Sequence, residues 1–346
     1  MRKGKLLAVI LAAAVVGTCI TGCGAESQAA AGQEKDTSNA KTVQMINGKD
    51  LTQVGFSAPA MDNEFQTNLS STLEAACKEN GIKYTVSEAQ QSAAKQAEQI
   101  ENMVTTGCEA IVVSPVDLDG ILDALKNAKS SGVFVSMIGV VPPSKDYYDV
   151  VVNVEQTDLG SQAAKAAASW IDKTFPDAAD GSIEVALLTL NNSEEATKRG
   201  EALAKVEEFT GKAKVVGEYD STGAASIPTK AQEYTEMLLT EHPDVKCILA
   251  YSDFMGLPAD EVVMRTKGID VAHFGIFGCD YSSAGCEAIE KSKTNESTYR
   301  ASGAFGVNFG KTVYDTIVGN VEVDGECVYY EPAFELTVDN VDQYLK

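Results

Sequence analysis

The sequence contains little histidine, the residue that enzymes use most often for acid–base and metal chemistry, since its 346 residues include only His242 and His273. We expect His242 at a helix end before Pro243 and His273 inside an apolar strand, so neither is placed as a base beside a nucleophile or as a zinc ligand. No Gly-x-Ser-x-Gly elbow and no Gly-x-Gly-x-x-Gly fingerprint occur. These absences argue against an enzyme, and we predict no catalytic residues, no cofactor and no metal.

One glycine pair invites comparison with a phosphate-binding loop. Gly306 and Gly310 precede Lys311 and Thr312, but only three residues separate the two glycines where that loop needs four. The segment is therefore not interpreted as a nucleotide site.

Basic residues are scarce as well, with 28 Lys and Arg against 50 Asp and Glu and a formal net charge of -22. A surface this acidic repels the phosphates of nucleic acids and of anionic lipid headgroups. We therefore predict that nucleic acid is not a partner.

The cysteines have neither the Cys-x-x-Cys spacing of a metal site nor the density of a disulfide framework. Cys77, Cys108 and Cys247 lie in apolar patterns, which favours buried, inert thiols. A bridge between Cys279 and Cys286 is left open.

The amino terminus has the layout of an export signal. Arg2, Lys3 and Lys5 precede an uncharged apolar run from Leu6 to Ile20, which is shorter than the roughly 20 residues of a membrane-spanning helix. The run ends in Ile20-Thr21-Gly22-Cys23, which resembles the bacterial lipoprotein cleavage box, and this resemblance implies lipidation of Cys23. The alternative is an ordinary secretory signal with an incidental cysteine.

The residues that follow Cys23 are almost all small or polar, which predicts a flexible tether. We therefore assign residues 1–22 to a lipoprotein signal peptide and residues 23–45 to the tether. The expected location is extracytoplasmic, with the protein anchored to the cell membrane through Cys23.

Beyond the tether, short apolar runs alternate with segments whose apolar residues recur every three or four positions. Unbroken apolar runs indicate strands buried on both faces, as in a parallel sheet covered by helices. The length of the chain suggests two such domains. The predicted fold is α/β, with two doubly wound parallel-sheet lobes, and its strands are expected near Val54–Phe56, Ala110–Val113, Val133–Ile138, Val150–Val154, Ile183–Leu188, Lys214–Val216, Cys247–Ala250 and Ala272–Phe277.

In sheets of this kind, ligands bind beyond the carboxyl ends of the strands. The residues that follow the predicted strands are Asp62, Asn63, Ser114, Asp117, Gly139, Val140, Asn191 to Arg199, Ser252, Asp253 and Asp280. Most of their side chains can form hydrogen bonds, which predicts a site for a small polar ligand.

Several segments from Gln53 onward resemble type I periplasmic sugar-binding proteins, the family that includes the ribose-binding proteins of ABC transporters. The resemblance is carried by the order and spacing of its motifs. These are Met61-Asp62-Asn63-Glu64-Phe65, Lys95-Gln96-Ala97-Glu98-Gln99-Ile100-Glu101, Gly107-Cys108-Glu109-Ala110-Ile111-Val112-Val113-Ser114-Pro115-Val116-Asp117, Lys198-Arg199-Gly200-Glu201, His242-Pro243-Asp244-Val245 and Phe277-Gly278-Cys279-Asp280.

The resemblance implies a hinge of three chain crossings, near Asn153, Ser302 and Pro332. Lobe 1 would comprise residues 46–153 plus 303–332, and lobe 2 residues 154–302 plus 333–346. Closure would capture a sugar or sugar-like ligand and deliver it to the permease of an ABC importer. The alternatives are a nucleoside-binding or polyol-binding lipoprotein and a sugar sensor that feeds a chemoreceptor. A sugar-responsive transcription regulator is disfavoured because the export signal stands where a DNA-binding headpiece is needed.

The resemblance also implies ligand contacts from both lobes. Asn63 would bind hydroxyls, Phe65 would face a sugar ring, and Arg199 and Asp280 would hold hydroxyls from the second lobe. Ser252 and Asp253 complete the predicted ligand-binding set. An exposed helix arginine is the alternative for Arg199, and helix capping is the expected role of Asp62.

Four residues depart from the pattern of the family. Gly139 and Val140 replace an Asp-Arg pair, Ser252 replaces an asparagine, and Ala304 replaces a glutamine. The pocket is therefore predicted to be less polar than a ribose site. Tyr251, Phe254 and Tyr281 are either apolar walls of this pocket or core residues.

Overall fold

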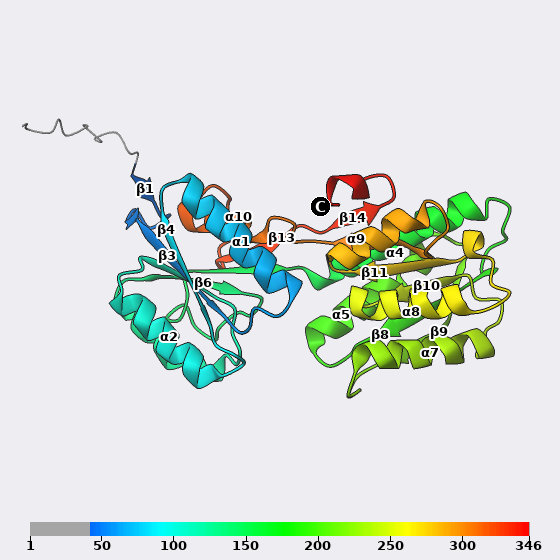
Figure 1. Ribbon diagram of the computed structural model, residues 1–346, viewed down its shortest axis with the longest axis horizontal. Helices are drawn as coiled ribbons and strands as arrows, with labels where there is room; N and C mark the ends of the chain where they lie inside the picture. Colours follow the sequence, from blue (N-terminus) through cyan, green and yellow to red (C-terminus); the bar gives the residue numbers. More distant parts are fainter. Residues whose placement is uncertain (1–41, 346) are drawn as a thin grey trace, which may run out of the picture. The chain divides into compact units, whose positions relative to one another are not determined.

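The computed structural model describes residues 42–345, which form two α/β lobes (Figure 1). The predicted signal peptide, Cys23 and nearly all of the predicted tether lie outside the described residues. The end of the tether was placed too late, because β1 (Val43–Gln44) already pairs antiparallel with β2 (Asp50–Leu51). No helix within residues 42–345 is both long enough and apolar enough to cross a membrane.

Lobe 1 is built on a six-stranded sheet in the order β13-β7-β6-β5-β3-β4, and every neighbouring pair in it is parallel. One face packs against α1 and α10, the other against α2 and α3. The elements are β3 (Gln53–Ala58), α1 (Glu64–Glu79), β4 (Lys83–Glu88), α2 (Ala93–Thr105), β5 (Ala110–Val113), a 3-10 turn (Asp119–Ile121), α3 (Leu122–Ser130), β6 (Phe134–Ile138), β7 (Val150–Val154), α10 (Phe309–Val318) and β13 (Val328–Glu331).

Lobe 2 has a second six-stranded sheet, in the order β14-β12-β11-β10-β8-β9, in which only β14 runs antiparallel to its neighbour. The two parallel-sheet lobes predicted from the sequence are thereby confirmed. The elements are α4 (Gln156–Thr174), β8 (Ile183–Thr189), α5 (Glu194–Ala204), α6 (Val206–Phe209), β9 (Ala213–Asp220), α7 (Ile227–Glu241), β10 (Cys247–Ala250), α8 (Asp253–Arg265), β11 (Gly275–Cys279), α9 (Ser283–Ser292), β12 (Tyr299–Ala304), β14 (Phe334–Thr337) and a 3-10 turn (Val341–Gln343).

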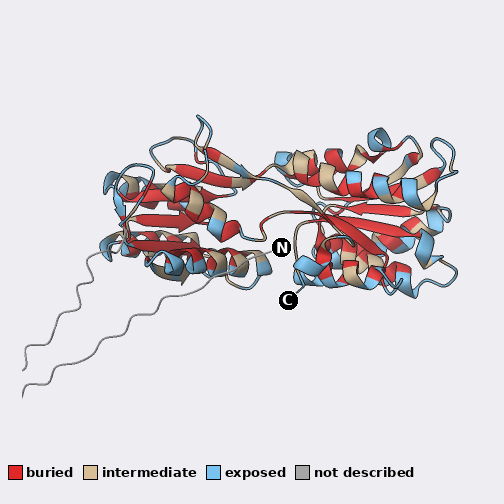
Figure 2. Cartoon of the chain, turned by 90° about the horizontal axis from the view of Figure 1, so that it is seen from above, coloured by how far each residue is buried: buried red, intermediate tan, exposed pale blue. Residues whose placement is uncertain are grey.

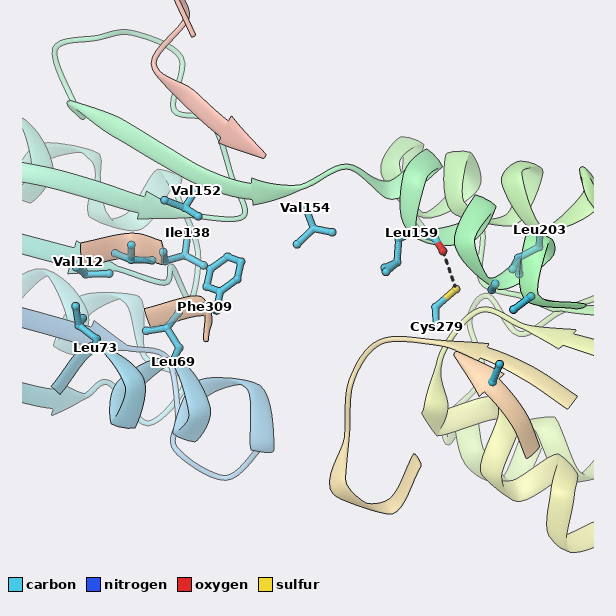
Figure 3. Close-up of a cluster of buried hydrophobic side chains, with 14 of the residues drawn as sticks. Leu69, Leu73, Val112, Ile138, Val152, Val154, Leu159, Leu203, Cys279 and Phe309 are labelled. Atoms are coloured by element: carbon cyan, nitrogen blue, oxygen red, sulfur yellow. Dashed lines mark hydrogen bonds between the residues drawn. The ribbon is translucent and has the colours of Figure 1, made fainter. Parts of the chain in front are cut away.

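The chain passes between the two sheets three times. It leaves lobe 1 after β7 ends at Val154, returns after β12 ends at Ala304, and leaves again after β13 ends at Glu331. Figure 3 follows the first passage, in which Val154 lies between Val152 of β7 and Leu159 of α4. Each lobe therefore consists of segments that are distant in the sequence.

The apolar runs of the sequence became strands because both of their faces are covered. Every residue of β5, β6, β10 and β11 is buried, and most of the strand ribbon is red in Figure 2, the colour of buried residues. The edge strand β4 instead contains no fully buried residue and has no apolar run. For that reason β4 was not predicted.

Two local expectations were wrong. Asn63, not Asp62, caps α1, because its side-chain oxygen accepts a hydrogen bond from the backbone of Gln66 at 3.0 Å. His273 does not lie in a strand, since Val271–His273 form an exposed 3-10 turn and its ring nitrogen Nδ1 is 2.7 Å from Asp270.

The bridge between Cys279 and Cys286 that the sequence left open is not present. Cys279 carries a thiol, whose sulfur lies 3.9 Å from the carbonyl oxygen of Leu159 (Figure 3). Burial raises the pKa of this thiol above its usual value. Cys279 is therefore an inert, buried residue at the end of β11.

The close packing of α1 against α10 leads to a stability prediction. A Cβ atom on Gly310 would lie 2.1 Å from the carbonyl oxygen of Leu69 and 2.3 Å from the backbone nitrogen of Leu73. Gly310→Ala should therefore lower the free energy of unfolding by about 1–3 kcal/mol, as measured by chemical denaturation.

Gly325→Ala is the matched control, because a Cβ atom there meets nothing within 4 Å. If the helix propensity of alanine were the only effect, Gly310→Ala would instead stabilise the protein by roughly 0.5–1 kcal/mol. Such a gain would contradict the packing described for α1 and α10.

Candidate ligand-binding site

A pocket of about 400 Å³ opens at the edge of lobe 2 where several strands end. Leu190, Tyr251 and Asp280 follow β8, β10 and β11 directly, so the carboxyl ends of neighbouring strands bring them together. The complete lining is Leu190, Arg199, Ile227, Pro228, Tyr251, Ser252, Phe254 and Asp280. Three of the predicted ligand-binding residues, Arg199, Ser252 and Asp280, belong to it.

Arg199 is the buried cation of this pocket, with only 7 % of its surface exposed. Its Nε donates to Gln156 Oε1 at 2.8 Å, and its Nη1 donates to the carbonyl oxygen of Tyr251 and to Asp280 Oδ1, both at 3.0 Å. The guanidinium also lies 4.3 Å from the centre of the Tyr251 ring. The alternative of an exposed helix arginine is therefore wrong.

The charge of Arg199 is maintained despite its burial. Burial lowers the pKa of the guanidinium, but the charge and hydrogen bond of Asp280, together with smaller contributions from Cys279 and Tyr251, offset that effect, and the pKa of Arg199 is raised above its usual value. The pocket thus holds a buried guanidinium paired with Asp280.

Asp280 is held in place by its own backbone. Its φ angle is 82°, its amide donates to the carbonyl oxygen of Gly303 at 2.9 Å, and its carbonyl oxygen accepts from Ser302 at 2.8 Å. Its side chain is 30 % exposed, so it reaches solvent while Arg199 is covered. A left-handed φ is tolerated by aspartate and asparagine better than by most residues.

The ion pair leaves one donor atom and one acceptor atom open, that is, without a hydrogen bond inside the protein. Among residues 42–345, neither Arg199 Nη2 nor Asp280 Oδ2 has a hydrogen-bond partner, whereas Nε, Nη1 and Oδ1 are all bonded. A guanidinium can only donate and a carboxylate can only accept. The pair can therefore bind hydroxyl groups, which both donate and accept.

Asp253, also predicted to contact ligand, has a different environment. It is buried, and its two carboxylate oxygens accept hydrogen bonds from the hydroxyls of Ser282 and Tyr299. It does not line the pocket and presents no open oxygen to it. Its neighbour Ser252 does line the pocket and is the N-cap residue of α8, without a side-chain capping bond.

Burial raises the pKa of Asp253 to about 7, against the opposing effect of its hydrogen bonds from Ser282 and Tyr299. The charges of Asp280 and Glu64 raise it further. Asp253 is therefore partly protonated near neutral pH.

The two predicted residues of lobe 1 lie at the start of α1. The side-chain oxygen of Asn63 caps the helix, so its amide group is the part left to bind a ligand. The ring of Phe65 packs 5.9 Å from that of Phe305 and 5.3 Å from that of Phe309. The ligand contacts predicted for Asn63 and Phe65 stay predictions.

The sequence interpretation assigned no contact to Glu64, which binds the first turn of α9. Its carboxylate oxygens accept hydrogen bonds from the backbone nitrogen of Ser283 at 3.0 Å and from its hydroxyl at 2.6 Å, at the first turn of α9. Gln156 was missed as well, although it orients Arg199. Neither role has a local signal, because each partner lies far away in the sequence.

A larger pocket of about 610 Å³ lies elsewhere in lobe 2, against α4, β12 and β14, and none of the predicted ligand-binding residues lines it. Arg300, the buried cation at its wall, is engaged by the carbonyl oxygens of Val271, Phe274 and Ser292. The smaller pocket is therefore the candidate ligand-binding site. Residues 42–345 contain no group of three or more side chains placed to hold a metal ion.

Comparisons with known proteins agree with this architecture. A family model described as a periplasmic binding protein domain matches residues 54–317. The ribose import binding protein of Bacillus subtilis is 26 % identical over 67 % of this chain and 71 % of its own length. A xylitol-binding protein of Mycolicibacterium smegmatis is 25 % identical over 97 % of this chain and 86 % of its own.

Solved structures share the fold. A periplasmic ribose ABC transporter protein from Conexibacter woesei superimposes with a TM-score of 0.66 at 19 % identity, covering 85 % of this chain and 94 % of its own. An ABC transporter solute-binding protein from Bacillus halodurans with bound myo-inositol gives 0.61 at 17 % identity, covering 85 % and 97 %.

The raised pKa of Asp253 makes stability depend on pH. Between the usual value near 3.8 and about 7, the native protein binds a proton at Asp253 that the unfolded chain does not. This contribution to the free energy of unfolding therefore falls as the pH rises through that window, by at most about 1.4 kcal/mol per pH unit, and then levels off.

Asp253→Asn should remove this contribution while keeping the shape of the side chain. Denaturation of both proteins at a series of pH values should show the stability difference, native minus variant, declining from about pH 4 to about pH 7. Parallel stability curves across that range would show that Asp253 does not titrate in this way.

Proposed function

Because this chain belongs to the family of periplasmic binding protein domains, we propose that it is an extracytoplasmic solute-binding protein that captures a sugar or polyol for an ABC importer. The observation that carries the proposal is the buried Arg199–Asp280 pair, which has an open donor and an open acceptor at the same pocket. The names of the similar proteins, which include ribose and xylitol binding, support this ligand class.

The binding chemistry follows from the hydrogen bonds that are already made. Gln156 and the backbone of Tyr251 hold the guanidinium in place, so little side-chain entropy is lost when a ligand arrives. A ligand hydroxyl would accept from Arg199 Nη2, and a neighbouring hydroxyl would donate to Asp280 Oδ2. Two adjacent hydroxyls are the defining feature of sugars and polyols.

Lobe 1 supplies the second half of the proposed site. Asn63 and Phe65 lie at the start of α1, directly after the loop that follows β3, at the carboxyl edge of its sheet. Movement about the three crossings would bring them to the ligand, and contacts with both lobes would favour the closed state. The permease would recognise closure and not the sugar itself.

The membrane anchor is the other part of the proposal. Cys23 follows an uncharged apolar segment and small residues, as in lipoprotein signals. Lipidation there would tether the lobes near the permease, and a polar tether of the predicted kind would let them move.

The ligand class can be tested by thermal unfolding with pentoses, hexoses, polyols and nucleosides. A true ligand at 100 times its dissociation constant should add about 2.7 kcal/mol to the free energy of unfolding and so raise the melting temperature. Asp280→Asn should weaken its binding by about 1–3 kcal/mol, because the amide replaces a charged acceptor. Asparagine suits this test because it tolerates the positive φ at this position.

Asp244→Asn is the control, since it removes an exposed carboxylate before β10, at the opposite edge of the lobe 2 sheet. This variant should bind as the native protein does. A panel in which only nucleosides respond, or none of the compounds does, would overturn the sugar or polyol assignment.

The anchor is tested separately by Cys23→Ala. This variant should move from the membrane fraction to the soluble fraction after cell breakage, because the acyl chains have lost their attachment point. Detergent extraction of the native protein serves as the control. Retention of the variant on membranes would refute lipidation at Cys23.

A further inference from the structure

Half of the residues that line the lobe 2 pocket are apolar, which the ion pair does not explain. Four of its eight lining residues, Leu190, Ile227, Pro228 and Phe254, have no hydrogen-bonding atom in the side chain. Phe254 is 68 % exposed, more than any other large apolar residue in the described part of the chain. A single exposed apolar residue needs no explanation, but Phe254 lies at a pocket with three further apolar lining residues.

Local structure places these residues at the pocket. α7 begins at Ile227, with Ser226 as its cap and Pro228 in its first turn, so two apolar residues are fixed at the mouth of the pocket. α8 begins at Asp253, whose carboxylate is bound by Ser282 and Tyr299. This anchor fixes the first turn of α8 and keeps Phe254 at the pocket instead of in the core.

The apolar part of the lining favours a methyl group of the ligand over a hydroxyl group. A ligand hydroxyl placed against it would lose water and find no partner, whereas a methyl group there would gain from leaving water. The remaining lining residues, Arg199, Tyr251, Ser252 and Asp280, carry polar atoms. The ligand should therefore carry an apolar group as well as hydroxyl groups.

On the basis of the proposed function, we infer that the preferred ligand carries a methyl group beside its vicinal hydroxyls, with Phe254 as the specificity-determining residue. The hydroxyls bind Arg199 and Asp280, and the methyl group packs on Phe254, Ile227 and Pro228. Such a methyl group belongs either to a 6-deoxy sugar or to a methyl glycoside.

Matched pairs of compounds test this inference by titration calorimetry. L-Fucose is compared with L-galactose, L-rhamnose with L-mannose, and free hexoses with their methyl glycosides. One methyl group in an apolar pocket is worth about tenfold or more in affinity, so at least one methyl-bearing member should bind about tenfold more tightly than its partner. If the 6-deoxy sugars show the tighter binding, the methyl group is C6 of the sugar; if the methyl glycosides show it, the methyl group is that of the glycoside.

Phe254→Ala should abolish most of that preference and leave the affinity for the parent compound nearly unchanged. Phe209→Ala is the matched control, because Phe209 is an exposed phenylalanine of the same lobe that ends α6, before β9 begins. It should keep the full preference of the native protein.

The outcomes separate this inference from the proposed function. If parent sugars bind as tightly as their methyl-bearing partners, the inference is wrong and the proposed function stands. It is also wrong if Phe254→Ala impairs uptake through the importer without changing any affinity, since Phe254 then contacts the permease. If no sugar or polyol binds at all, both are overturned.

Discussion

The ion pair between Arg199 and Asp280 is the interaction on which the site in lobe 2 depends. A buried guanidinium loses much of its hydration, and that cost is offset only if its hydrogen bonds and its countercharge are in place. Here they come from the first turn of α4, the residue after β10 and the residue after β11. Together with α5, which carries Arg199, these make four segments of lobe 2 that must be correctly packed before Arg199 can be buried.

The same requirement separates the two aspartates near the pocket. Asp280 lies beside the guanidinium and reaches solvent, whereas Asp253 is buried and receives hydrogen bonds only from neutral hydroxyl groups. Burial therefore raises the pKa of Asp253 to about 7. One carboxylate is left to meet a ligand, while the other fastens α8 to the start of α9 and to β12.

Much of the fold was predictable because strands covered on both faces have continuous apolar sequences. β5, β7 and β10 have the bounds expected from their apolar runs. β12 was not recognised as a strand, because its sequence Tyr-Arg-Ala-Ser-Gly-Ala is partly polar although every residue in it is buried. Gly303 explains part of this composition, since a Cβ atom there would lie 2.2 Å from the carbonyl oxygen of Leu159 in α4.

The sequence by itself determined the α/β class and the two lobes, and its motifs predicted Arg199 and Asp280 as ligand contacts, because periodicity and motif spacing are local properties of the chain. Only the tertiary structure decided which atoms of that pair remain open, that Asp253 is enclosed, and that Phe254 lies at the pocket and not in the core. These features depend on contacts between segments 29 to 81 residues apart. No local pattern records such contacts, because packing of the whole lobe establishes them.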